Sequence, residues 1–388
     1  KPLELRVSGL GGELCTVQAE ADWTAGRAKA AVEAAAGVPA AAQRLLVAAG
    51  ELRDDTVLGT IPDWQEGKVL DITLVRRSPA YVELIEHLGL AGPLDARRAF
   101  ARASEDLKAE REVALAAFRR SGLALSDAPE DLRGDRDLVL AAVRTDGAAL
   151  AYASSGLQAD HQVVLRAVHS HGCALRFAAP PLQADRGIVL TAVRRSGAAL
   201  EHASVELRGD REVVLAAMES DGRALRYVSD ALLEDREIVL AAVRSNSEAL
   251  AFVVPAHRAD REIVLAAVAA AAPEACGQEA CSALKYASDE VRMDREVVLA
   301  AVRANGTALR HAAGPAREDR EVILAAASAS PQALRHAPDW ARADRALVHE
   351  AVRRHGAALK YAAEPVRGDK EVVLSAVQNN GSALQYAS

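Results

Sequence analysis

The residue types that could carry out chemistry in this chain are few and scattered. His169, His171 and Cys173 stand at alternate positions, and His161 precedes them by eight residues. Imidazole and thiolate groups bind zinc, but a zinc site needs three or four of them to converge. His171 and His355 share one place in a repeated pattern, and His161 stands where other copies have Arg. We therefore expect exposed variation here, and we predict no metal and no cofactor.

A second pair of sulfur groups, Cys276 and Cys281, has the spacing Cys-x₄-Cys. No other Cys or His pair accompanies it, so the pattern favours free thiols in a loop, with a local disulfide or redox pair as the alternative. The insertion near 269–280 that holds Cys276 is also a candidate partner contact, because insertions in repeat proteins gather on one face.

Catalytic motifs are missing from the sequence. It contains no phosphate-binding Gly-x-x-x-x-Gly-Lys-[Ser/Thr] loop, no Gly-x-Ser-x-Gly nucleophile turn and no His-Glu-x-x-His pair. Acidic residues are plentiful, but they recur at the same place in successive copies of a repeat instead of interrupting it. We therefore expect that the protein is not an enzyme.

An Asp-Arg pair that returns every 25 residues is the most regular charged feature. It predicts either a surface for an anionic partner or ion pairs between copies, and the acid beside nearly every Arg favours ion pairs. The chain has 47 basic and 54 acidic residues, a net charge of −7, which argues against a nucleic-acid partner. The candidate partner-binding arginines of this row are Arg136, Arg186, Arg211, Arg236, Arg261, Arg295 and Arg320.

These pairs belong to a repeat of about eleven copies, with one nine-residue insertion near 269–280. Each copy predicts a helix of roughly ten residues that begins at the Asp, a Gly with positive φ after it, a shorter second helix and a polar turn. Neither helix is stable alone, so stacked copies must cover each other. A ring recurs near the end of the second helix and predicts a stacked spine. The ring positions are Tyr152, Phe177, His202, Tyr227, Phe252, Tyr286, His311, His336, Tyr361 and Tyr386.

The composition agrees with a helical array. Of the 388 residues 50% are apolar but only 3% are aromatic, so small aliphatic side chains form the core. The recurring Asp-Arg-Glu-Val-Val-Leu-Ala-Ala-Val and Gly-x-Ala-Leu-x-Tyr-Ala-Ser segments resemble the repeat named domain of unknown function 4116. That resemblance covers about residues 105–388 and implies an all-helical repeat array, with no activity attached.

Residues 1–77 resemble a ubiquitin-like β-grasp domain, through strand-like segments at 3–7, 14–17 and 70–76, a helix at 24–36 and the sequence Gln-Arg-Leu-Leu-Val-Ala-Ala-Gly at 43–50. The resemblance implies an apolar recognition patch. Leu46 keeps its place in that patch, whereas Ser8 and Thr73 stand where Leu and Val are expected, and Asp71 replaces a His.

These observations predict an α+β protein with three parts: a ubiquitin-like domain at 1–77, a helical connector at 78–104 and an α-helical repeat solenoid at 105–388. We expect a protein-interaction scaffold with no membrane span, intracellular and favoured to be cytoplasmic. Because the chain begins at Lys1, the possibility of a removed targeting peptide stays open. Adaptor of the ubiquitin–proteasome pathway and subunit of a large assembly are the alternatives. The remaining candidate partner contacts are Leu46, Thr73 and Trp340.

Overall fold

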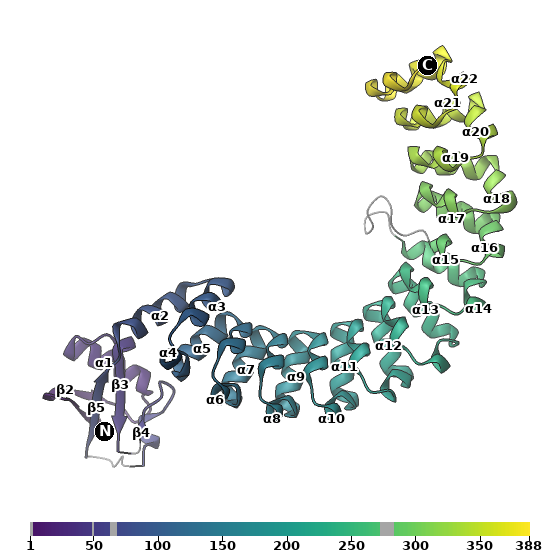
Figure 1. Cartoon of the computed structure of the whole chain (residues 1–388). Coiled ribbons are helices and arrows are strands. Elements are labelled where there is room, and N and C mark those ends of the chain that lie inside the picture. Colours follow the sequence, from purple (N-terminus) through teal and green to yellow (C-terminus); the bar gives the residue numbers. More distant parts are fainter. Residues whose placement is uncertain (1–2, 49, 63–67, 272–282) are drawn as a thin grey trace. The chain divides into compact units, whose positions relative to one another are not determined.

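The computed structural model describes residues 3–48, 50–62, 68–271 and 283–388 (Figure 1). The chain divides into two compact units, residues 1–157 and 158–388. The first unit contains an N-terminal sheet domain, two connecting helices and the first two copies of the repeat, and the second unit contains the remaining copies. A mixed sheet followed by a long run of helices confirms the predicted fold class.

The sheet domain is built on five strands. β1 (Leu3–Gly9) and β2 (Gly12–Ala19) form a hairpin, and β5 (Val69–Arg76) runs parallel to β1. β3 (Gln43–Val47) pairs antiparallel with β5 and with β4 (Gly50–Glu51). The strand order is therefore β2-β1-β5-β3-β4. Alternate residues of these strands are buried, so one face of the sheet forms a core and the other stays exposed.

One helix, α1 (Ala25–Ala36), supplies the buried Ala28 and Val32 to that core. Thr24 caps the start of α1 by accepting a hydrogen bond from the backbone N–H of Arg27. Gly37 ends the helix with a φ of 68°, a conformation that suits glycine. The described part of the domain also contains two 3₁₀-helices, η1 (Ala40–Ala42) and η2 (Leu58–Thr60).

Two helices, α2 (Pro79–Leu90) and α3 (Pro93–Arg102), connect the sheet domain to the repeats. Both pack against the first long helix of the array, α5 (Arg111–Arg120). The fully buried Phe100 of α3 meets Phe118 of α5 edge to face, with ring centroids 5.7 Å apart. This aromatic contact fixes the connector on the array within the first unit.

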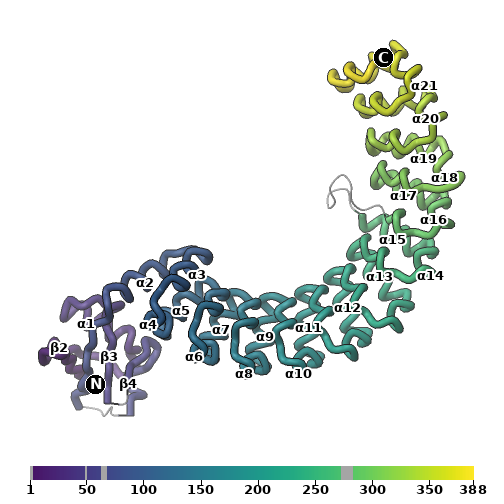
Figure 2. The backbone as a smooth tube through the Cα atoms, in the orientation of Figure 1, coloured from purple at the N-terminus to yellow at the C-terminus, as the bar shows by residue number. Residues whose placement is uncertain are grey.

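Each copy begins with a helix of ten residues, as the spacing predicts. In α12, for example, Asp210 caps the helix and Val213, Val214, Ala217 and Met218 form its fully buried stripe. The other long helices after α5 are α7 (Arg136–Thr145), α9 (His161–Ser170), α11 (Arg186–Arg195), α12 (Arg211–Ser220), α13 (Arg236–Ser245), α15 (Arg261–Ala270), α17 (Arg295–Ala304), α19 (Arg320–Ala329), α21 (Arg345–Arg354) and α23 (Lys370–Asn379). In the second unit each packs on the next, from α9 to α23 (Figure 2).

The second element of each copy is a 3₁₀-helix, six residues long in all but one of the described copies. Its small residues and leucine are buried beneath the long helices, as Ala224 and Leu225 are. The elements are η3 (Gly122–Asp127), η4 (Gly147–Tyr152), η5 (Gly172–Phe177), η6 (Gly197–His202), η8 (Gly222–Tyr227), η10 (Ser247–Phe252), η11 (Ala283–Lys285), η12 (Gly306–His311), η13 (Pro331–His336), η14 (Gly356–Tyr361) and η15 (Gly381–Tyr386).

The glycine that opens most of these 3₁₀-helices does not have a positive φ, so that part of the sequence prediction is wrong. Among the described glycines, positive φ occurs only at Gly12, Gly37, Gly50 and Gly314. The repeat glycine is needed for close approach instead. A Cβ on Gly222 would lie 2.0 Å from the carbonyl oxygen of Ala242 in the next copy. At Gly222 the two copies therefore touch backbone to backbone, closer than a Cβ allows, whereas two other copies have Ser247 and Pro331 at this place.

The predicted polar turn before each Asp is in fact a third, short helix. It stays short because the Asp that follows begins the next long helix. These elements are α4 (Glu105–Ala109), α6 (Glu130–Arg133), α8 (Ser155–Gln158), α10 (Pro180–Gln183), η7 (Leu207–Gly209), η9 (Asp230–Leu232), α14 (Pro255–Arg258), α16 (Asp289–Met293), α18 (Gly314–Glu318), α20 (Asp339–Ala343) and α22 (Glu364–Arg367). None of the helices in the described chain combines the length and apolar character needed to cross a membrane.

Candidate functional site

The arginines that begin the long helices, here called the arginine row, are held by acids of the following copy. Arg186 donates from Nε to Asp210 Oδ2 at 3.0 Å and pairs through Nη2 with Glu212. The same double pairing, to the capping Asp and to the acid two residues later, recurs along the array. It is made by Arg111, Arg186, Arg211, Arg236, Arg261, Arg295 and Arg345.

The capping Asp of this row makes two kinds of contact. Oδ1 of Asp210 accepts from the backbone N–H groups of Glu212 and Val213, at 3.0 and 3.1 Å, while Oδ2 accepts from Arg186. The hydrogen bond from Arg186, followed by the one from the Val213 backbone, lowers the pKa of the Asp210 carboxyl. The same residue therefore caps its own helix and ties it to the previous copy.

Three positions of the row do not show this double pairing. Arg320 reaches Asp344 at 3.5 Å without a second acid, because Ala346 stands where other copies have an acidic residue. His161 replaces the arginine and lies 4.0 Å from Asp185. Arg136 begins α7. The ion pairs between copies that the sequence favoured therefore join described copies within each unit.

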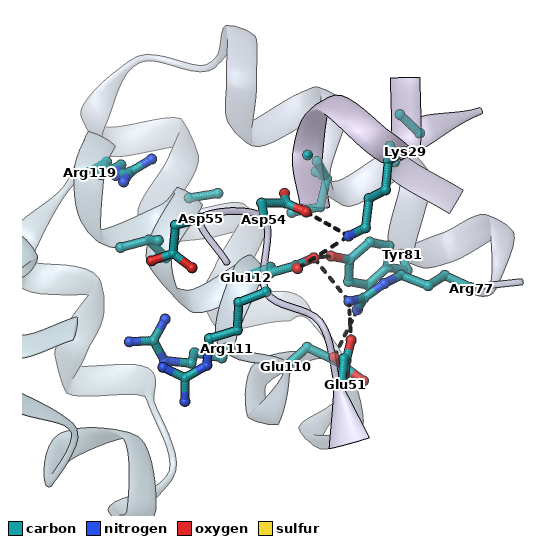
Figure 3. A pocket seen from close by; sticks show the side chains of 17 residues that line it. Lys29, Glu51, Asp54, Asp55, Arg77, Tyr81, Glu110, Arg111, Glu112 and Arg119 are labelled. Carbon is teal, nitrogen blue, oxygen red and sulfur yellow. Dashed lines mark hydrogen bonds and ion pairs between the residues drawn. The ribbon is translucent and has the colours of Figure 1, made fainter. Parts of the chain in front are cut away.

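Arg77 of the sheet domain extends this row by one member, although it begins no helix (Figure 3). Arg77 lies directly after β5, and its side chain is 5% exposed. Its Nη1 lies 2.9 Å from Glu110 and its Nη2 lies 3.0 Å from Glu112. Glu110 and Glu112 hold, in the first copy, the places of the capping Asp and of the acid two residues after it. Arg77 therefore docks the sheet domain on the first copy by the contact that joins one copy to another.

Further charged groups surround Arg77 in Figure 3. Lys29 of α1, whose side chain is also 5% exposed, pairs with Asp54 at 2.7 Å and lies 3.7 Å from Glu112. Tyr81 donates from its hydroxyl to Glu112 at 2.6 Å, and its ring lies beneath the guanidinium of Arg77. Burial, together with the bond to Glu112, raises the pKa of Tyr81.

A cavity of about 700 Å³ opens beside this cluster, between the sheet domain and α5. Its wall includes Lys29 and Arg77, whose charges are already paired with carboxylates, and Arg119, which lies apart from that cluster in Figure 3. Cations and carboxylates line it in equal number. The arrangement stabilises a junction and presents no unbalanced charge to a ligand.

The rings of the second unit form a different row, here called the ring row, at the ends of the 3₁₀-helices. They are at least partly exposed, and the Phe and Tyr rings among them contact cations. Within the described residues the one ring pair is Phe100–Phe118, outside this row, so the predicted ring-on-ring spine is wrong. Cζ of Arg226 lies 4.7 Å from the ring centroid of Tyr227 and 5.9 Å from that of Phe252. Nζ of Lys360 likewise lies 5.8 Å from the rings of Tyr361 and Tyr386. Cations thus separate rings of successive copies.

Four successive copies of the second unit place a cation directly before the ring. These four residues, here called the basic row, are Lys285, Arg310, Arg335 and Lys360, and all are exposed. In the earlier copies of the second unit cations stand only in alternate copies, at Arg176 and Arg226, and the copies between and after them have Glu201 and Ala251. The basic row also changes the pKa of a neighbouring histidine. Burial and then the nearby Arg310 and Lys285, with smaller effects of Arg292 and His336, lower the pKa of His311 to about 4.

The comparison with known families agrees with the observed period. A model of the family described as Domain of unknown function (DUF4116) matches residues 135–183, 185–233, 235–269, 278–313 and 344–388, together more than half of the chain. The chain belongs to the DUF4116 family. No curated protein matches it. The copy that begins at Asp319 lies between two of the matches, yet it has the same three helical elements as its DUF4116 neighbours.

Trp340, a candidate partner contact, is partly exposed on the surface of the DUF4116 array. It lies on α20, its side chain is 42% exposed, and its indole N–H donates to Glu318 at 2.6 Å. The ring therefore bridges two short helices of neighbouring copies and still leaves surface uncovered. Its assignment as a partner contact stays a prediction.

The sheet domain brings its own candidate residues together. Thr73 of β5 lies opposite Ser8 of β1 on one side and opposite Leu46 of β3 on the other. Residues directly opposite one another in a sheet point to the same face. Thr73 is exposed, and Ser8 and Leu46 are partly exposed. Next in register, Arg6 pairs with Asp71 at 3.5 Å.

The histidine and cysteine side chains of the first candidate cluster do not converge. His161 lies near Asp185, and Sγ of Cys173 lies 3.4 Å from the hydroxyl of Ser196. Within the described residues no three His, Cys, Asp or Glu side chains are grouped for a metal ion. Cys276 and Cys281 lie outside the described residues.

Two features of the site were not predicted from the sequence. Arg77 has no spacing signal, because it precedes Glu110 by 33 residues whereas Arg186 precedes Asp210 by 24. The basic row had a signal, since the residue before each ring varies in charge along the DUF4116 array while the Leu that precedes it is constant. Comparing copies at that single position shows that cations stand in four successive copies at 285–360, whereas in earlier copies they stand only at Arg176 and Arg226.

Proposed function

We propose that the protein is a non-enzymatic scaffold that binds other proteins along its repeats, with the N-terminal sheet domain as a second contact. The observation that carries this proposal is the ring row. It offers partly exposed rings and exposed cations at one position in successive copies, so a partner that contacts one copy can contact the next. Aromatic and Arg side chains are the residues that protein interfaces favour.

A row of equivalent positions suits weak contacts that add up. Each contact after the first is intramolecular, so binding strengthens without any single strong site. The arginine row supports the same proposal indirectly. Because its ion pairs join one copy to the next, it stabilises the surface on which the ring row is displayed.

We propose that the sheet domain is ubiquitin-like. Its order β2-β1-β5-β3-β4, with one helix across one face, supports this assignment. On the exposed face, Leu46 lies beside Thr73, and Ser8 lies on the other side of Thr73. Two of these three positions are hydroxyl residues, so the patch offers less apolar surface than the resemblance implies.

That patch favours one second candidate, an adaptor of the ubiquitin–proteasome pathway. Leu46 is its apolar centre, while the Arg6–Asp71 ion pair lies next in register and adds charge. Because the patch is small and partly charged, we expect ubiquitin receptors to bind it weakly. A subunit role in a larger assembly is compatible with the scaffold proposal and would differ from it in partner stoichiometry.

The test is affinity purification of the chain with cross-linking mass spectrometry, beside a Leu46→Asp variant. The scaffold proposal expects stoichiometric partner proteins cross-linked to the repeats in both samples. Ubiquitin-pathway partners that disappear with Leu46→Asp would favour the adaptor. Finding no partner in either sample, or a turnover activity in the purified chain, would overturn the scaffold proposal.

A further inference from the structure

We propose that the basic row binds an extended acidic segment of a partner protein. Lys285, Arg310, Arg335 and Lys360 would meet carboxylate side chains, and the rings after them would meet the residues between those acids. This inference rests on the proposed scaffold function and adds the chemistry of the partner.

The first argument is that these cations are open. All four are exposed, and none is within ion-pair distance of an acid of the described chain. Arg310 donates only to Nε2 of His311, at 2.8 Å. The arginine row gives the contrast, because Arg186 and its equivalents already bind two acids each. The cations of the basic row can therefore bind an anionic partner without first breaking an ion pair.

The second argument is that rings hold some of these cations in place. Nζ of Lys285 lies 5.2 Å from the ring centroid of Tyr286, and Lys360 lies between the rings of two successive copies. A cation that rests on a ring keeps fewer rotamers, so it loses less entropy when it binds an anion. The uncovered parts of the rings add apolar surface between the charges.

The third argument is spacing. Packed helices lie about 8–10 Å apart, which sets the step from copy to copy. A segment in the extended polyproline II conformation advances about 3.1 Å per residue with three residues per turn, so three residues cover about one step and return the side chain to the same side. A segment with an acid at every third residue would therefore place one carboxylate at each member of the basic row.

The fourth argument favours a polypeptide over a nucleic acid. The short helices that follow the rings carry exposed carboxylates, such as Glu290 and Glu364, in the same copies. A continuous phosphate backbone would meet these acids as well as the cations, whereas separated side-chain carboxylates can meet the cations alone. The net charge of −7 opposes a long polyanion further.

The experiment measures fluorescence anisotropy of a labelled (Glu-Gly-Ser)₄ peptide on the whole chain in low salt, with (Gln-Gly-Ser)₄ as the neutral probe. The test variant changes Lys285, Arg310, Arg335 and Lys360 together to Gln. The matched control changes four exposed arginines of the long helices, Arg144, Arg194, Arg244 and Arg353, to Gln. Both variants lose the same charge, and thermal melts verify that both fold.

The expected result is binding of the acidic peptide by the unchanged chain and a loss of about tenfold or more in the test variant, since exposed ion pairs contribute about two- to fivefold each. The control should stay within about twofold. No binding by the unchanged chain, equal loss in both variants, or tighter binding of a labelled dodecauridylate would each overturn the inference. If the peptide fails while partners still cross-link to the repeats, the scaffold proposal stands and only this inference falls.

Discussion

The arginine row and the ring row repeat with the same period in the same array, yet they use their charges in opposite ways. Each arginine of the first row meets acids that the next copy provides, as Arg211 meets Asp235 and Glu237. The ring row has cations in contact with rings and, from Lys285 to Lys360, no acid in reach among the described residues. The comparison teaches that regularity alone does not identify a binding surface. What distinguishes the rows is whether the chain satisfies its own charges.

The largest expected effect tests whether the arginine row is structural. Arg77→Gln removes a buried cation that contacts Glu51, Glu110 and Glu112. We expect the unfolding free energy of the first unit to fall by about 3 kcal/mol, because breaking a buried pair leaves its partners uncompensated. Urea unfolding, followed by amide hydrogen exchange in β5 and α5, measures this. Arg76→Gln, at an exposed neighbour, is the control, and equal effects of the two changes would contradict the prediction.

A second change disturbs the close backbone contact between adjacent copies, on which both rows depend. Gly222→Ala forces a Cβ against the carbonyl oxygen of Ala242 and should cost about 2 kcal/mol, as overpacking does. Gly381 has the same place in its copy, and nothing lies within 4 Å of its Cβ position. Gly381→Ala should therefore be nearly neutral in the same thermal unfolding experiment. A similar loss at both glycines would disprove the close-approach explanation.

A third change removes one acid of the arginine row. Asp210→Ala deletes a helix cap as well as the partner of Arg186, and we expect a loss of about 1 kcal/mol at pH 7. The folded pKa of Asp210 is lowered, so its contribution is present above the ordinary Asp pKa of about 3.9 and disappears as pH falls below it. The variant should therefore lose less stability than the unchanged chain on acidification. Glu219→Ala, on the same helix, should leave that acid dependence unchanged.

The smallest expected effect distinguishes the rows by pH. His311 has a pKa lowered to about 4, so the unfolded chain binds this proton more readily than the folded one. Stability should be complete above the ordinary His pKa of about 6.5 and fall as pH drops toward 4, a window above that of Asp210. His311→Phe should remove this share, and His169→Gln, at an exposed position elsewhere, should retain it. Melting temperatures between pH 7 and 4.5 measure it, and an unchanged slope in His311→Phe would contradict the account.

Local signals explain why much of the fold is predictable. The Asp cap and the apolar spacing after it specify the ten-residue helices, and Thr24 and Gly37 mark the ends of α1 within the chain segment itself. What the sequence could not reveal depends on neighbours. The role of Gly222 depends on a carbonyl 20 residues away in sequence, and two of the partners of Arg77, Glu110 and Glu112, lie in the repeat array. The candidate site was half predicted, because the rings were recognised but the cations between them were not.

The contact made by Arg261 has a consequence for engineering. Arg261 pairs with Asp294 and Glu296, which lie 33 and 35 residues further on, as Arg236 pairs with Asp260 and Glu262 at 24 and 26. The long helices α15 and α17 also pack directly on each other. The array thus keeps its register whether the linking segment is short or long. The stretch between 271 and 283 is accordingly the place where a reporter domain or an epitope could be spliced in while the helices on either side keep their mutual packing.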